Sequence, residues 1–192
     1  MKGFVRKNQL LSLCGLNCGL RTMRIGDYCG GCGNGNQSCA IARCSLAHDG
    51  VEYCYECRDF PCEKYRDAGQ YDSFITHRRQ MDDLALAARD GIEAYNAVQW
   101  EKVEILHRLL SEYNDGRKKT LFSLAVNLME LPDLQWAMAL IDTQDNAGTM
   151  PQKDRAKLAA DILQQIADER KLVLKLNRKN DDGAQSPCFS II

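Results

Sequence analysis

The sequence lacks long hydrophobic runs, a strong charge of either sign and the short motifs of common catalytic sites. No apolar run approaches the roughly 18 residues that a membrane span needs. The formal net charge is -1, which gives no strong attraction to nucleic acid or to an anionic membrane. No G-x-S-x-G element, phosphate-binding loop or dinucleotide fingerprint is present. The apolar stretch Leu10–Leu13 is also too short for a secretory signal, so we expect a cytoplasmic protein.

Cysteine is the residue that the sequence has in excess. The 192-residue chain contains 10 cysteines, and all but Cys188 lie between Cys14 and Cys62. One stretch of that segment, Y-C-G-G-C-G-N-G-N-Q-S-C at 28–39, contains no aliphatic residue. Hydrophobic burial alone therefore does not offset the chain entropy that folding this part costs.

The spacing of the cysteines predicts metal ligation. C-x-x-C pairs occur at Cys29/Cys32 and Cys54/Cys57, and close pairs separated by short loops are typical of structural zinc. A structural zinc contributes on the order of 10–16 kcal/mol in small peptides, against about 2–4 kcal/mol for a disulfide, and cytoplasmic disulfides are rare. The predicted Zn²⁺ ligands are Cys14, Cys18, Cys29, Cys32, Cys39, Cys44, Cys54, Cys57 and Cys62.

Several arrangements of these ligands remain open at the level of sequence. Eight thiolates make two closed sites, so the ninth is a spare thiol, a bridge between two ions, or the sign of a three-thiolate site with an open position. His48 is a further candidate ligand, although an exposed loop histidine is the plainer interpretation. Sequential pairing is slightly favoured over interleaved pairing. An iron–sulfur cluster is the alternative cofactor, because sulfur ligands suit both metals.

The rest of the chain predicts a helical bundle of about five helices, which makes the protein mostly α. We expect a cysteine-rich, metal-stabilised module over residues 1–70, a helical domain over 71–180 and a flexible tail over 181–192. The expected helices run from Ser73 to Arg89, along the apolar face from Ile92 to Tyr113, over 121–131, from Pro132, and from Pro151 to about Leu176. Trp100 and Trp136 are expected in the core.

The order of the cysteine motifs resembles a known family. These motifs are C-G-L-N-C-G at 14–19, C-G-G-C at 29–32, C-x-I-x-x-C at 39–44, G-V-E-Y-C-Y-E-C at 50–57 and F-P-C-E-K at 60–64. Together they resemble the bacterial and archaeal cysteine-rich family catalogued as domain of unknown function 3795, over roughly residues 8–70. The stretch 114–131 is similar to longer members. The resemblance implies zinc binding and no particular activity. Members often carry cysteine where this chain has Arg21.

These observations favour a zinc-dependent structural or protein-interaction module, with the helices as a surface for a partner or for self-association. The alternative is an enzyme or redox protein with an open, cysteine-ligated metal or iron–sulfur centre. Residues 1–70 carry nine Lys/Arg and seven Asp/Glu, and eight thiolates with two zinc ions bring the charge of the module to about −2. That charge is unlike the basic surface of a nucleic-acid-binding zinc domain.

Overall fold

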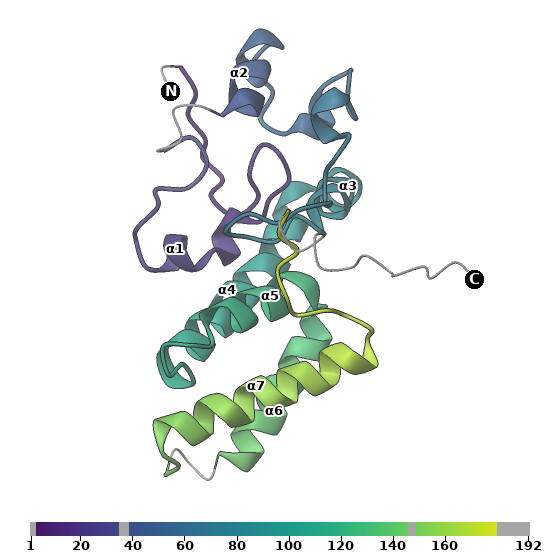
Figure 1. The fold of residues 1–192 in the computed structure, drawn as a ribbon. Helices are drawn as coiled ribbons and strands as arrows, with labels where there is room; N and C mark the ends of the chain where they lie inside the picture. The colour runs from purple at the N-terminus through teal and green to yellow at the C-terminus, as the bar shows by residue number, and fades with distance from the viewer. Residues whose placement is uncertain (1–2, 35–38, 146–148, 180–192) are drawn as a thin grey trace, which may run out of the picture.

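The protein is mostly α-helical, as the sequence predicts. The computed structural model describes residues 3–34, 39–145 and 149–179. Across those ranges it contains seven α-helices and three short 3-10 helices, and the only β-type pairing there is an isolated bridge between Leu11 and Asn17. Figure 1 shows the irregular N-terminal part at one end of a bundle formed by the later helices. The predicted tail over 181–192 lies outside the described residues.

The cysteine-rich part consists of short helices joined by irregular chain. Its elements are η1 (Cys18–Leu20), α1 (Thr22–Ile25), α2 (Ala40–Ala47), η2 (Cys54–Glu56) and η3 (Glu63–Tyr65). Its own small core contains three buried apolar residues, Phe4, Leu13 and Ala42, with partly buried cysteines packed around them. Leu11 and Tyr53 are buried in a second cluster against α3 and α4, so part of the apolar burial of this segment depends on the bundle.

Five helices form the bundle: α3 (Gln80–Asp90), α4 (Ile92–Glu112), α5 (Lys119–Leu128), α6 (Leu131–Gln144) and α7 (Gln152–Glu169). The long α4 follows the predicted apolar face, and α6 has its proline in the first turn, where the missing N–H costs nothing. Helix α5 is central, since six of its ten residues are buried. None of the described helices has both the length and the apolar character that crossing a bilayer requires.

Two predicted helix boundaries are wrong. Helix α3 begins at Gln80 instead of Ser73, because the Asp72 carboxylate accepts hydrogen bonds from the His77 N–H at 2.8 Å and the Thr76 hydroxyl at 3.0 Å. Those bonds hold residues 72–77 in a turn instead of a helix. Helix α7 ends at Glu169 instead of near Leu176, two residues before Lys171, whose φ of 58° is left-handed.

The chain after α7 returns along the bundle toward α3, as the yellow segment of Figure 1 shows. The Arg78 guanidinium donates to the carbonyl oxygens of Val173 at 2.7 Å and Lys175 at 3.0 Å, and the Asn177 N–H donates to the Asp72 carboxylate at 2.9 Å. The residues predicted to extend α7 therefore close the bundle as an extended strap.

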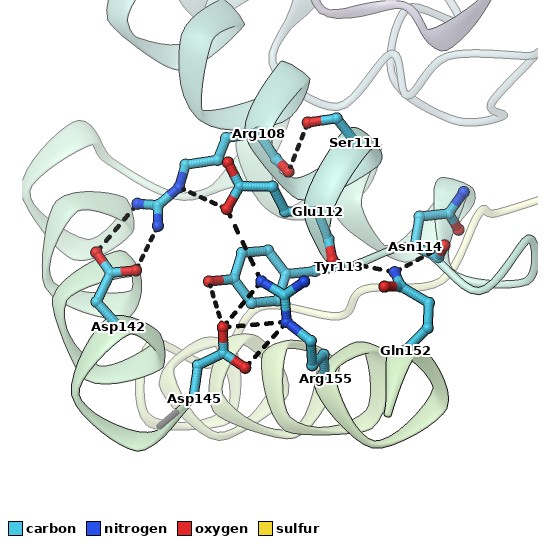
Figure 2. A network of polar contacts seen from close by, with 9 residues as sticks. All are labelled: Arg108, Ser111, Glu112, Tyr113, Asn114, Asp142, Asp145, Gln152 and Arg155. Carbon is cyan, nitrogen blue, oxygen red and sulfur yellow. Dashed lines mark hydrogen bonds and ion pairs between the residues drawn. The ribbon is translucent and has the colours of Figure 1, made fainter. Parts of the chain in front are cut away.

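A polar network joins the ends of α4, α6 and α7 (Figure 2). The Arg155 guanidinium donates to both carboxylate oxygens of the buried Asp145 and lies 4.7 Å from the centre of the Tyr113 ring. Arg108 on α4 makes a second bidentate ion pair, with the Asp142 carboxylate on α6. Paired charges and an arginine over an aromatic face are strong polar contacts, so this end of the bundle is rigid.

The bundle core also includes a residue from the cysteine-rich part. Leu20 of η1 is fully buried among residues of α4 to α7, and its carbonyl oxygen accepts a hydrogen bond from Ser123 of α5. The two parts therefore share one hydrophobic core. The prediction that both tryptophans lie in the core is wrong: Trp100 is 57% exposed and Trp136 is 45% exposed.

A buried lysine on α4 leads to a pH-dependent stability. The Lys102 side chain is buried and its Nζ donates to the Met129 carbonyl at 2.6 Å. Burial, and secondarily the neighbouring Arg79 cation, lower the pKa of Lys102 from 10.5 to about 8, against the opposing charges of Glu130 and Asp83. Between those two pH values the unfolded chain binds more protons than the folded protein, so this group makes stability rise with pH.

We therefore expect Lys102→Met to stabilise the protein more below pH 8 than at pH 10.5. The difference in unfolding free energy between variant and wild type should shrink by up to about 3 kcal/mol across that window. Urea unfolding at several pH values measures it. The titration of the cysteines is common to variant and wild type, so it cancels in the difference between their free energies of unfolding. A difference that does not change with pH would show that Lys102 titrates normally.

Candidate metal centre

The loop that presents Cys14 and Cys18 is fixed against the bundle by its glycine. Gly15 has a φ of +89°, and a Cβ at this position would lie 2.4 Å from the Gln80 carbonyl oxygen of α3. Only glycine allows both the left-handed backbone and this close approach. The Cys14 carbonyl oxygen accepts hydrogen bonds from the Gln80 amide at 2.8 Å and the Tyr65 hydroxyl at 3.3 Å. The backbone of the first cysteine is thus held by two distant elements.

Four cysteines form what we call the first thiol group: Cys14, Cys18, Cys32 and Cys39. Cys14 and Cys18 come from the loop before and at the start of η1, Cys32 from the C-G-G-C turn, and Cys39 from the residue before α2. Their thiols are close enough to influence one another electrostatically. Ser12 lies 3.2 Å from the Cys14 sulfur, and the Cys39 sulfur accepts from the Ala42 N–H at 3.4 Å. The group therefore combines thiols that are far apart in the sequence.

Three thiols of this group, those of Cys14, Cys18 and Cys32, resist ionisation. Burial, together with the nearby Cys14 and Cys32 thiols, raises the pKa of Cys18 to about 12. Burial likewise raises the pKa of Cys14 and of Cys32, with Cys39 adding to both. Near neutral pH these groups are therefore uncharged unless a cation is bound between them, and metal binding there must release protons.

The second thiol group consists of Cys44, Cys54, Cys57 and Cys62. These four cysteines line a small cavity of ≈ 20 Å³ together with His48, Ser45, Lys64 and apolar side chains. The 3-10 turn η2 sets the spacing of the C-x-x-C pair, since the Cys57 N–H donates to the Cys54 carbonyl at 3.1 Å. Burial raises the pKa of Cys54 to about 11, and the thiols of Cys14, Cys62 and Cys44 add to the shift.

Cys29 does not share the environment of its C-x-x-C partner Cys32. Its sulfur lies 3.8 Å from the Arg21 guanidinium, which also lies over the Phe74 ring. Arg21 is the position where the resembling family often has cysteine. In this chain the side chain at that position is a cation in place of a further thiol ligand.

The tightest cluster of ligand-type atoms includes two residues that are not cysteine. In the parts of the chain that the structure describes, only His48, Cys57 and Asp59 have three or more such atoms all within 4.8 Å of one another. Asp59 was not predicted as a ligand. Its position in C-R-D-F-P-C, between two cysteines, is the sequence signal that points to it.

The donor atoms of the first thiol group suit zinc, but their spacing is wider than in a closed site. In a tetrahedral zinc site with a bond length of about 2.3 Å, sulfurs lie about 3.8 Å apart. No three ligand atoms of this group fall within 4.8 Å of one another, judged over the described residues. The nine described cysteines are all free thiols, so none of the predicted ligands is used in a disulfide. Binding one ion among these thiols therefore requires the loops to bring the sulfurs closer together.

The largest hollow lies away from the thiols. A hollow of ≈ 530 Å³ lies between the N-terminal segment, α1 and α4, with Trp100 and Arg24 in its walls. Among the described residues that line it, none is a cysteine.

These features define a class of protein in which a cysteine-rich segment of short helices packs on a helical bundle. A family model described as a protein of unknown function (DUF3795) matches residues 20–67. The match confirms the resemblance seen in the motifs over that segment, about a quarter of the chain. Cys14, Cys18 and the stretch 114–131 lie outside it. Neither the curated proteins nor the solved structures contain a significant match to the chain.

Proposed function

We propose that the protein is a cytoplasmic zinc-binding protein whose cysteine-rich part is a structural and protein-interaction module. Zinc held by the thiols fixes the fold of the first third of the chain. The helical bundle supports that module and offers the surface for a protein partner or a second copy. The exposed side chains of Trp100 and Trp136 belong to that surface, because exposed aromatic residues are enriched where proteins bind each other.

The observation that supports this proposal is the first thiol group. Four free thiols from separate loops lie near one another, beside a small cluster of buried apolar residues. Burial makes the charged forms of Cys14, Cys18 and Cys32 costly, and a divalent cation reverses that cost. Zinc is the cation that an all-sulfur ligand set favours in the absence of redox chemistry. A structural site of this kind contributes directly to the folding free energy.

Metal analysis of protein purified without oxygen and without added metal tests the proposal. We expect about two equivalents of zinc, one at each of the two thiol groups. Cys14→Ser combined with Cys32→Ser should remove about one equivalent, because both thiols belong to the first thiol group. Cys188→Ser is the matched control and should keep the zinc content of the wild type.

Other results of the metal analysis would contradict the proposal. Iron with acid-labile sulfide would replace the proposal with the iron–sulfur alternative. Protein that contains no metal, or a double variant that keeps the full zinc content, would overturn it.

A further inference from the structure

His48, Cys57 and Asp59 occupy one edge of the second thiol group. His48 follows the last residue of α2, Cys57 follows η2, and Asp59 lies two residues further along the chain. The imidazole Nε2 lies 3.3 Å from the Asp59 Oδ2, and all three ligand atoms lie within 4.8 Å of one another. Atoms at such separations are brought into contact with one ion by small side-chain rotations.

One ring nitrogen of His48 is held by the backbone. His48 Nδ1 lies 2.9 Å from the Cys44 carbonyl oxygen, which can only accept a hydrogen bond, so Nδ1 carries a proton. Nε2 is then the ring nitrogen left to ligate a cation, and it lies 3.3 Å from the Asp59 carboxylate. Metal-ligating histidines are commonly oriented by this kind of bond from the other nitrogen to a backbone carbonyl.

The three side chains can be reached from solvent. A hollow of ≈ 270 Å³ is lined by His48 and Cys57 together with Asp49, Glu56 and Arg58, and the Asp59 side chain is 55% exposed. Two carboxylates against one guanidinium give the lining of this hollow a net negative charge, which attracts cations. His48 and Cys57 also line the smaller cavity of ≈ 20 Å³ that the four cysteines share.

We propose that His48, Cys57 and Asp59 form a mixed-ligand zinc site that is open to solvent and exchanges its ion. The inference rests on the proposed zinc binding and specifies the character of the second site. One nitrogen, one sulfur and one oxygen are ligands that zinc accepts, and three protein ligands leave a fourth position for water. The site binds zinc more weakly than the first thiol group, because it has one thiolate instead of four and an exposed carboxylate. It is therefore the position at which the module gains and loses metal.

Cobalt exchange into the zinc-loaded protein tests this site. Co²⁺ is added to wild type, His48→Gln and Asp59→Asn, with absorbance and residual zinc measured together. We expect wild type to take up about one Co²⁺ per chain, with the weak charge-transfer absorption of a single thiolate, while the zinc of the first thiol group stays bound. Each variant should bind Co²⁺ at least about 10- to 100-fold more weakly. Asp49→Asn, in the same hollow but outside the triad, is the matched control and should behave as wild type.

The possible results separate this inference from the proposed function. Cobalt binding that persists in His48→Gln and Asp59→Asn but is lost in Cys54→Ser and Cys62→Ser would identify a four-thiol second site. That result would overturn the inference and leave the zinc module intact. The purified protein could also lack zinc in the first thiol group and still take up cobalt in a way that depends on His48 and Asp59. That result would overturn the proposed function and leave this inference intact. Loss of uptake in the Asp49→Asn control would show an unspecific effect of charge and would also overturn the inference.

Discussion

Removing zinc with a strong chelator is expected to abolish the amide protection of residues 8–34 and 39–67 while α6 and α7 stay protected. The cysteine-rich part has a small apolar core of its own and many irregular turns, so the proposed zinc binding implies that its fold depends on the ions. In zinc-finger peptides the apparent contribution of such an ion is on the order of 10 kcal/mol, which exceeds what the small core supplies. Hydrogen exchange with mass spectrometry, before and after chelation, measures the effect segment by segment.

The helices provide the internal control for this experiment. Amides of α6 and α7 lie in the large core, whose residues come almost entirely from α4 to α7, and their exchange should change little. Adding zinc back under reducing conditions should restore protection. If the cysteine-rich segments exchange as slowly after complete chelation as before, the metal does not hold this fold and the proposed function is wrong.

Leu20→Ala is expected to lower the free energy of unfolding by about 2–5 kcal/mol, the usual cost of removing a large buried aliphatic side chain. Leu20 is 0% exposed and belongs to the core of the bundle, although it lies two residues after Cys18. The substitution leaves a cavity where η1 packs on α4 and α5. Urea unfolding of the protein as purified, without a chelator, measures the loss, and we expect one cooperative transition under that condition because the two parts share this core.

A leucine on the surface of the same region is the control. Leu46 of α2 is 42% exposed, so Leu46→Ala should change the free energy of unfolding by less than about 0.5 kcal/mol. Equal effects of the two substitutions would contradict the shared core. Two separate transitions in the wild type would also contradict it, since the module and the bundle would then unfold independently.

The helical part could be predicted where the pattern is local. The apolar period of α4 and the proline that starts α6 depend on residues within a few turns, and both elements formed as expected. The start of α3 and the end of α7 could not be predicted in the same way. The Asp72 carboxylate binds residues 76 and 77 and also Asn177, which lies more than 100 residues away. Contacts over such separations leave no periodic signal in the sequence.

The same difference between local pattern and long-range contact applies to the candidate ligands. The sequence determined that the first third of the chain is rich in thiols and poor in aliphatic residues, because composition needs no knowledge of the fold. Only the tertiary structure decided that Cys29 faces Arg21, that Cys32 joins Cys14, and that Asp59 meets His48. Which side chains meet depends on how the loops close against α2, α3 and one another, and the spacing of cysteines along the chain does not encode that closure.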